Sequence, residues 1–549
     1  MRESATSHTT PSLVRWTRPV WLALLAVLLI AAGLRALLLI SEAVSFHSDE
    51  AVVALMARHI LQGERPVFFY GQAYMGSTDA WLVAGGFALL GERVLAIRLV
   101  QSALYLGVVG VGFALAWRMT GRIASAVVTG LLFACPPVLM ALYTTATLGG
   151  YNETLLLGGI VLLLAVQIMD GQGGSLWRWR LMGLCAGIGW WANGLIVLML
   201  APAAVLLLVW LWRGGSGIPR LRLLACFGSA LGLFFVGSAP WWEFALRSDL
   251  APLRFFIGSS GAQDGFAGTD VISLPFGERL VGLFFLGIPA LLGMRFPWTS
   301  VYFMPVLGVV VLAVGVLLLV SFARRGGRLM PSAYARGLLW AMLGIFAVIF
   351  LFSRFSSDPT GRYFLPLVFP VFVMFGAVIG AARSPVLRAL PALLLLGYFA
   401  WGQLDAASRE PGLTTQFNLQ THIPNDDDAA LIAFLNENGL ARGYTTYWIS
   451  FRMAFLSGES VQYSASLPYK SDLTYTPLDE RYPAYREAAD AAERFAFITA
   501  NVPELDALLE EELRAAGVTD YRAGQIGPFR VYYDFLPEDV IVPRPPFTR

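Results

Sequence analysis

Residues 20–51 read VWLALLAVLLIAAGLRALLLISEAVSFHSDEA, and this stretch decides the fold class. The run 20–40 is almost entirely apolar and is long enough to cross a bilayer as an α-helix, which takes about 20 residues. The apolar core of a signal peptide is shorter, so we interpret this run as a retained transmembrane helix. A polar segment that ends in the acidic pair Asp49 and Glu50 follows directly, where the chain leaves the membrane.

Apolar runs recur along most of the chain. Hydrophobic residues make up 57% of the sequence and charged residues only 14%, whereas soluble domains have about 25% charged residues. We therefore predict an α-helical polytopic membrane protein with about 11 transmembrane helices. The predicted spans are 20–40, 94–117, 123–142, 152–169, 181–193, 195–212, 222–241, 301–322, 337–353, 363–382 and 388–403.

Charge is distributed unevenly between two parts of the chain. Residues 1–403 contain 27 basic and 15 acidic residues, a net charge of +12, whereas residues 404–549 contain 12 basic and 22 acidic residues, a net charge of −10. Most of the excess arginine flanks the apolar spans, so the basic part predicts contact with a membrane and no nucleic-acid partner. The positive-inside rule places the N-terminus in the cytoplasm. An odd number of spans then places residues 404–549 on the extracytoplasmic side of the cell (inner) membrane.

Two domains follow from this pattern. Residues 1–403 form a transmembrane domain with two long outer loops, 41–93 and 243–300, and residues 404–549 form a soluble extracytoplasmic domain. Within the first loop, 50–62 and 77–90 are expected to be helices that lie in the membrane interface. The tail alternates between helical and strand patterns, which favours a small α/β domain. Its expected elements are helices at 426–438 and 502–517 and strands at 443–450, 494–500 and 528–535.

The first outer loop carries the clearest candidates for chemistry. Asp49 and Glu50 lie close to the hydrocarbon boundary, where ionised carboxylates are costly unless they are hydrated, paired or used. The same loop holds the polar stretch 70–77, with Tyr74 in it, and Asp79 just beyond. Taken alone, Asp49 and Glu50 fit a solvated loop or a helix cap, but the polar stretch and Asp79 in the same loop favour a binding surface. A shared divalent cation is a further possibility for the three carboxylates, but oxygen ligands alone are a weak signal, and we assign no metal or cofactor.

Polar residues at the predicted outer ends of other spans are candidate substrate-binding groups. Arg98 begins one span, and Arg362 with Tyr363 begins another. A guanidinium group matches two phosphate oxygens, although an arginine at a span end can also serve only as an interfacial anchor. Glu153 opens a further span, where it either faces an outer cavity or complements a helix N-terminus.

The order of these motifs resembles that of the GT-C glycosyltransferases, the superfamily of protein O-mannosyltransferases and aminoarabinose transferases. One span is followed by a long outer loop that opens with Ser48-Asp49-Glu50-Ala51, and Arg98 heads the next span. The segment Gly361-Arg362-Tyr363-Phe364-Leu365-Pro366 is similar to an R-Y-x-x-P pattern of bacterial members. The resemblance implies a polyprenyl-phosphate-sugar donor, inverting transfer, Asp49 as the general base and Glu50 as a group that helps to hold the acceptor. It also implies that Arg98 and Arg362 stabilise the departing lipid phosphate.

Other functions stay open at this stage. The acceptor could be a lipid, a glycan or a protein. A lipid or glycan transporter (a flippase) is one alternative, although transporters usually place ionisable residues near the membrane midplane and contain repeats. A polyprenyl-diphosphate glycan polymerase or ligase is another alternative.

Overall fold

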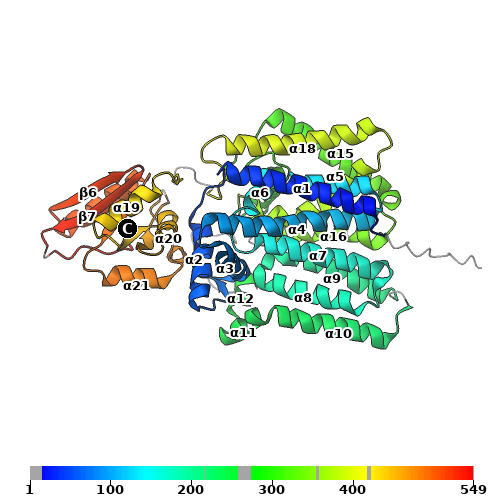
Figure 1. The fold of residues 1–549 in the computed structure, drawn as a ribbon, viewed down its shortest axis with the longest axis horizontal. Helices are drawn as coiled ribbons and strands as arrows, with labels where there is room; N and C mark the ends of the chain where they lie inside the picture. The colour runs from blue at the N-terminus through cyan, green and yellow to red at the C-terminus, as the bar shows by residue number, and fades with distance from the viewer. Residues whose placement is uncertain are drawn as a thin grey trace, which may run out of the picture.

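The membrane part of the chain is a bundle of long apolar helices that run side by side (Figure 1). The computed structural model describes residues 15–214, 217–257, 274–353, 356, 358–416, 422–470, 472–538 and 540–547. Within these residues, nine helices are long and apolar enough to cross a membrane. They are α1 (Arg18–Ile40), α4 (Val94–Thr120), α7 (Tyr151–Gln167) with η1 (Ile168–Gln172), α9 (Val197–Trp212) with η2 (Gly194–Ile196), α10 (Arg220–Gly237), α15 (Pro305–Leu329), α16 (Ala333–Phe352), α17 (Val368–Gly380) with η7 (Arg362–Leu367), and α18 (Pro385–Ala407).

The remaining two predicted spans are shorter helices, so the count of eleven is not confirmed. The predicted span 123–142 is divided into α5 (Ile123–Ala134) and α6 (Val138–Tyr143). Pro136 and Pro137 separate the two helices, because proline disfavours helix at the preceding residue and lacks an amide hydrogen. The predicted span 181–193 lies within α8 (Leu176–Ala192), which has 17 residues.

Helix α8 packs against α10 through glycine. A Cβ atom added to Gly183 would lie 2.0 Å from the carbonyl oxygen of Ala230, and one added to Gly187 would lie 2.1 Å from that of Phe234. The two glycines are four residues apart and therefore share a helix face. The backbones of α8 and α10 approach each other directly along this face, as small residues allow in membrane helix pairs.

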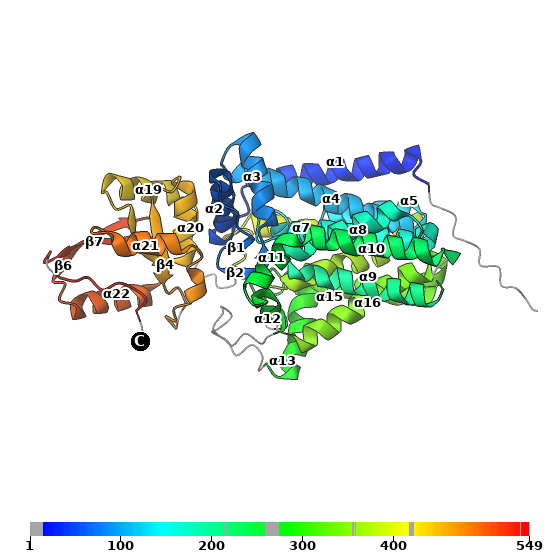
Figure 2. The ribbon, with the colours of Figure 1, turned by 90° about the horizontal axis from the view of Figure 1, so that it is seen from below.

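Both outer loops lie at the same end of the bundle, between the spanning helices and the tail (Figure 2). The helices predicted at 50–62 and 77–90 are present as α2 and α3, although α2 begins two residues earlier. Residues 258–273 of the second loop lie outside the described residues. The elements of the first loop are α2 (Ser48–Gln62), β1 (Phe68–Phe69), β2 (Gln72–Gly76) and α3 (Thr78–Leu90); those of the second are α11 (Ala239–Arg247), α12 (Ala251–Ile257), α13 (Phe276–Val281), η5 (Gly282–Gly287) and α14 (Ile288–Leu291).

The tail contains a five-stranded sheet with helices on both faces, so its expected α/β class is confirmed. The strand order is β4-β3-β5-β7-β6; β3 pairs in parallel with β4 and β5, and β7 pairs antiparallel with β5 and β6. Side chains of β5 alternate between the two apolar cores, one with α19 and α20 and the other with α22. The elements are α19 (Asp428–Glu437), β3 (Arg442–Thr446), α20 (Tyr447–Leu456), β4 (Gln462–Leu467), η9 (Pro477–Asp479), α21 (Pro483–Ala491), β5 (Ala496–Ala500), α22 (Pro503–Ala515), β6 (Asp520–Ile526) and β7 (Phe529–Leu536).

One predicted tail strand was partly wrong, and the error matters for the site. The strand expected at 443–450 ends at Thr446, and α20 begins at the next residue. Tyr447, Phe451 and Phe455 recur every four residues and share an apolar core with α2 and α3. Burial of this helical face against α2 outweighs the β propensity of the local sequence.

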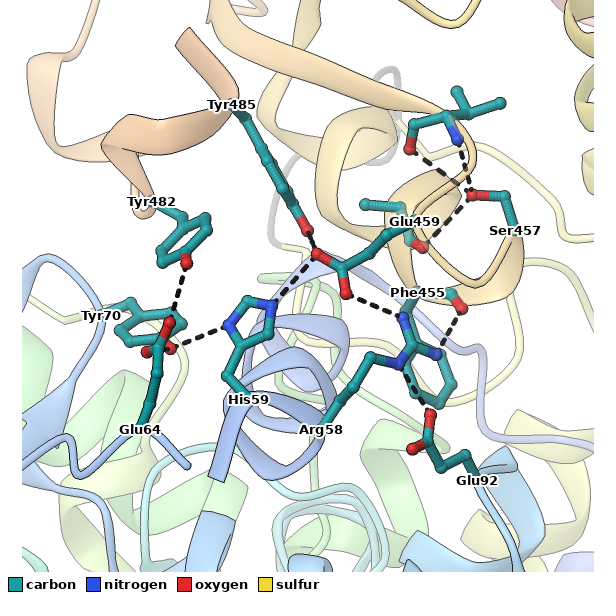
Figure 3. Close-up of polar contacts among 12 residues, drawn as sticks. Arg58, His59, Glu64, Tyr70, Glu92, Phe455, Ser457, Glu459, Tyr482 and Tyr485 are labelled. Atoms are coloured by element: carbon teal, nitrogen blue, oxygen red, sulfur yellow. Dashed lines mark hydrogen bonds and ion pairs between the residues drawn. The ribbon is translucent and has the colours of Figure 1, made fainter. Parts of the chain in front are cut away.

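Polar contacts across the same interface join the tail to the first outer loop (Figure 3). Glu459 of the tail accepts a hydrogen bond from the Tyr485 hydroxyl at 2.7 Å and lies 3.0 Å from Nε2 of His59 on α2. Its second oxygen lies 3.4 Å from Nη1 of Arg58, whose Nε contacts Glu92 at 2.7 Å. We call these residues (Arg58, His59, Glu92, Glu459 and Tyr485) the docking cluster.

Candidate active-site cavity

A cavity of about 790 Å³ opens where the membrane bundle, the first outer loop and the tail meet. The β1–β2 hairpin contributes Tyr74 to its wall, and Tyr143 and Tyr151 come from the ends of α6 and α7. Asp49 and Arg362, which sequence reasoning selected separately, line this same cavity.

Asp49 stands in the first turn of α2, with 32% of its side chain exposed. The hydroxyl of Tyr447 donates a hydrogen bond to Oδ1 at 2.5 Å, and Thr415 donates a long one to Oδ2 at 3.5 Å. Nδ1 of His47 lies 4.0 Å from Oδ2. Burial lowers the pKa of His47 to about 4, against the opposing charge of Asp49, so the imidazole is neutral near pH 7. Asp49 is thus held in place by neutral groups while part of its carboxylate faces the cavity.

The segment before Asp49 is itself fixed by the start of the tail. The backbone of Val44 bridges to Leu413, and the Leu413 amide donates to the carbonyl of Ala43 at 2.7 Å. The Asn425 side chain bonds both backbone groups of Phe46, at 3.1 and 2.8 Å. Asn425 precedes α19, whose N-cap is Asp427. Asn425 instead positions the loop that carries Asp49.

Arg362, which also lines the cavity, is the first residue of η7. Its Nε is 2.5 Å from Oδ2 of Asp358, and the guanidinium carbon lies 5.2 Å from the ring centre of Tyr363. Gly361, which precedes it, has φ +86, and its added Cβ would lie 2.8 Å from that of Ala290. Glycine is therefore required at the turn that aims Arg362 at the cavity.

Glu50 and Arg98 form a buried ion pair behind the cavity wall. Nη2 of Arg98 lies 2.6 Å from Oε2 of Glu50, whose side chain is completely buried. Burial raises the pKa of Glu50 to about 7, although the charge of Arg98 opposes the shift. Neither residue is part of the cavity lining. Glu50 and Arg98 thus lie behind Asp49, outside the cavity lining.

Asp79 and Glu153 are also buried away from the cavity. Asp79 accepts hydrogen bonds from the Gly149 amide at 3.0 Å and the Thr147 hydroxyl at 3.2 Å, and burial raises its pKa to about 6. It ties the start of α3 to the loop before α7. The Glu153 carboxylate lies near Asp79 in this region and is 4% exposed. Tyr363 is in contact with Arg362 but does not itself line the cavity.

The three loop carboxylates point to different partners. Asp49 contacts Tyr447, Glu50 contacts Arg98, and Asp79 contacts the backbone near Gly149. Among the residues that the structure describes, no group of three or more His, Cys, Asp or Glu side chains is placed to hold a metal ion. A cation shared by Asp49, Glu50 and Asp79 is therefore not supported by this geometry.

Comparison with solved structures identifies the architecture. No protein-family model matches the chain, and no curated protein matches it by sequence. The chain is similar to the structure of ArnT from Cupriavidus metallidurans bound to undecaprenyl phosphate, at 15% identity and a TM-score of 0.56, covering 94% of this chain and 98% of that one. It is also similar to the oligosaccharyltransferase AglB from Archaeoglobus fulgidus in complex with an inhibitory peptide and a dolichol-phosphate, at 12% identity and a TM-score of 0.52, covering 94% and 74%. Both are GT-C membrane glycosyltransferases. The chain has the GT-C fold.

Within this GT-C fold, the tail supplies part of the cavity wall that sequence reasoning missed. Besides Thr415, the tail contributes Trp448, Lys470 and Arg481 to the lining, and Tyr447 binds Asp49. These residues lie about 370–430 positions after Asp49, and no local motif marks them. The only available signal was the polar, tyrosine-rich segment 468–482, which is unlike a packed helix or strand.

Proposed function

We propose that this protein is a glycosyltransferase that moves a sugar from a polyprenyl-phosphate carrier to an acceptor on the extracytoplasmic face. The observation that carries the proposal is the presence of Asp49 and Arg362 on one cavity wall at the end of the membrane bundle. The two structural neighbours were solved with undecaprenyl phosphate and dolichol-phosphate, which are lipids of the proposed donor class. The positive-inside pattern supports a cytoplasmic N-terminus and an extracytoplasmic tail.

The proposed reaction is a single inverting displacement. The acceptor hydroxyl attacks the anomeric carbon while the bond from that carbon to the phosphate oxygen breaks, and the lipid phosphate leaves. Asp49 takes the proton of the attacking hydroxyl as general base. Arg362 stabilises the charge that develops on the phosphate, because its planar donors match two oxygens.

The remaining candidate residues divide into two groups in this proposal. Tyr74 lines the cavity and can bind substrate directly; burial raises the pKa of its hydroxyl, with Arg362 and Arg481 opposing the shift, so it acts as a neutral donor. Glu50, Arg98, Asp79 and Glu153 keep the surrounding elements in place, and Tyr363 supports Arg362. The acceptor-binding role expected for Glu50 and the phosphate-binding role expected for Arg98 are thus replaced by positioning roles.

The test is the Asp49→Asn variant of the full-length protein. Turnover should fall roughly 10²–10⁴-fold, the range for loss of a general base, while binding of the lipid carrier should change little. Transfer is measured from a short-chain polyprenyl-phosphate sugar, and carrier binding is measured with undecaprenyl phosphate. Asp426→Asn, on the exposed tail surface, is the matched control. Near-normal turnover of Asp49→Asn would show that another group is the base.

A further inference from the structure

Two cationic side chains of the tail line the cavity and are not used in the proposed displacement. Lys470 and Arg481 lie in the connection between β4 and α21. Lys470 is the only lysine of the chain. Arg481 is only 9% exposed, and its guanidinium carbon lies 5.8 Å from the ring centre of Phe69 and 5.4 Å from that of Tyr447. The hairpin and α20 thus hold Arg481 at the wall.

Neither cation forms an ion pair with a carboxylate of the described residues. Nζ of Lys470 donates to the Thr476 hydroxyl at 3.0 Å. The two terminal nitrogens of Arg481 donate to the side-chain oxygen of Gln72 at 2.6 and 2.7 Å, in the amide orientation that satisfies both groups. Nε of Arg481 is buried without a hydrogen-bond partner. In the described part of the chain, no carboxylate oxygen lies within 4.0 Å of either cation.

Two acidic side chains lie near Arg481 without pairing with it: burial lowers the pKa of Arg481, but Tyr447, Tyr74, Asp49 and Asp479 outweigh this effect and raise it. Asp479 also lines the cavity, beyond ion-pair distance from both cations. Burial raises the pKa of Asp479 to about 6, although Arg481 and Lys470 oppose the shift. A nearly buried guanidinium group whose Nε has no hydrogen-bond partner is costly. The cost is offset when an anionic ligand enters the cavity and accepts the remaining hydrogen bonds.

Aromatic rings lie on the same part of the wall. Trp448 and Tyr469 both line the cavity, with ring centres 5.8 Å apart and ring planes at 75°. Aromatic side chains are common in the walls of pockets that bind small organic ligands. The apolar face of a sugar ring can pack on these rings while its charged substituent reaches Lys470 or Arg481.

The phosphate of the donor is expected to bind Arg362 and not Lys470 or Arg481. Arg362 begins a membrane-bundle element, η7, and the hydrocarbon chain of a polyprenyl donor has to follow the bundle helices to stay in the membrane. Lys470 and Arg481 come from the tail, which lies beyond the outer loops at one end of the bundle (Figure 2). The cavity therefore has cations from two parts of the chain, Arg362 from the bundle for the donor and Lys470 with Arg481 from the tail for a second anion.

We propose that Lys470, Arg481, Trp448 and Tyr469 form the acceptor subsite, and that this subsite selects a saccharide acceptor that carries an anionic group. The proposal rests on the glycosyltransferase function proposed above. It explains how a tail with a net charge of −10 can still recognise an anionic acceptor: the selective charge is local and partly buried.

The first experiment compares the binding of three monosaccharides to the full-length protein in detergent. Glucuronic acid, glucose and glucosamine differ in charge but share a ring. We expect glucuronic acid to bind at least about ten-fold more tightly than glucose, and glucosamine most weakly, because hydrogen bonds to charged groups are the strong ones. Lys470→Gln and Arg481→Gln should each reduce this preference about ten-fold, and Arg481→Lys should retain part of it. Arg442→Gln, a tail arginine outside the cavity lining, is the matched control.

The second experiment measures binding of undecaprenyl phosphate to the same variants. Lys470→Gln should bind this lipid as the wild type does, whereas Arg362→Ala should bind it more weakly. If Lys470→Gln and Arg481→Gln weaken lipid binding as much as Arg362→Ala does, these cations hold the donor phosphate and the acceptor proposal is wrong, while glycosyl transfer still stands. Equal affinity of the wild type for glucuronic acid and glucose would also overturn the proposal. A thermal-unfolding transition within a few degrees of wild type shows that a variant is folded.

Discussion

The hydroxyl of Tyr447 lies 2.5 Å from Oδ1 of Asp49, although 398 residues separate the two in the sequence. Tyr447 is the first residue of α20 in the tail, and Asp49 is in the first turn of α2 in the outer loop. The candidate base is thus oriented by the tail. The membrane domain alone lacks the hydroxyl group that binds this carboxylate.

Removal of this hydroxyl should slow the reaction without unfolding the protein. In Tyr447→Phe the ring still packs in the core shared with α2, so the fold should be kept. Hydrogen bonds to charged groups contribute about 1.5–3 kcal/mol, so turnover should fall about 10–100-fold. The measurement is transfer from a polyprenyl-phosphate sugar. Tyr463→Phe removes a buried tail hydroxyl that binds the Leu440 carbonyl far from Asp49, and unchanged turnover is expected for this control. Equal loss in both variants would indicate a general effect on the tail.

Two substitutions of Arg362 should distinguish the contribution of its positive charge from that of its planar guanidinium group. Arg362→Ala should weaken binding of undecaprenyl phosphate and lower turnover, each by about ten-fold or more, because the paired charge-assisted hydrogen bonds from the guanidinium group to the phosphate are lost. Arg362→Lys should recover only part of both, because an ammonium group cannot donate in a planar pair. Lipid binding and transfer are measured side by side. Wild-type lipid affinity in Arg362→Ala would remove this residue from the donor site.

The buried pair Glu50 and Arg98 should show strong coupling. Arg98→Met leaves the carboxylate of Glu50 buried without its 2.6 Å partner, and breaking such a pair costs about 3–5 kcal/mol. The double variant Glu50→Gln/Arg98→Met should be more stable than the single Arg98→Met variant, since no charge is then left buried. Thermal unfolding in detergent measures both. Additive effects of the two substitutions would show that the pair does not act as a unit.

Local sequence predicted the parts of the site that lie within one loop, and failed where distant segments meet. The helix expected at 77–90 was recognisable from an apolar run that follows Ser77 and ends before Gly91. Asp49 and Arg362 were found because each is a polar residue near the end of an apolar run, and Tyr74 was found because it lies in the polar stretch 70–77 of the same loop. Lys470 and Arg481 gave no such signal, since their role depends on how the tail packs on α2.

Two errors in the predicted secondary structure have physical causes that the structure shows. The run 123–142 is apolar throughout, and hydropathy alone could not divide it, but Pro136 and Pro137 break it. The strand expected to extend to Ser450 ends at Thr446, because α20 buries its aromatic face on a helix about 400 residues away. The membrane bundle could be predicted from composition, whereas the cavity could not, because it depends on packing between distant segments.

Glycine at the α8–α10 contact should be essential for the bundle. Gly183→Ala places a methyl group 2.0 Å from the Ala230 carbonyl oxygen, so the two backbones must separate. Overpacking of this kind costs about 1–3 kcal/mol, and the unfolding temperature in detergent should fall. Gly228→Ala on α10 is the matched control, because its added Cβ meets no atom within 4 Å. A similar fall in both variants would contradict the packing argument.

The docking cluster should make the attachment of the tail sensitive to acid. Burial would raise the pKa of Glu459, but the hydrogen bonds from His59 and Tyr485, with the nearby charge of Arg58, outweigh it and lower the pKa from 4.5 to about 2. A carboxyl group whose pKa is lower in the folded state stabilises the fold above its unfolded pKa, and this contribution disappears as the pH falls. The contribution of Glu459 should therefore be full above about pH 4.5 and decline toward pH 2.

Comparison of wild type with Glu459→Gln tests this dependence. The difference between their unfolding temperatures should be largest near pH 7, shrink below pH 4.5 and be smallest at the lowest pH that the detergent-solubilised protein tolerates. Glu437→Gln, on the exposed face of α19, should match wild type at every pH. The decisive observation is the sign of the trend: a difference that grows as the pH falls would mean that Glu459 is not held as a paired carboxylate between α2 and the tail.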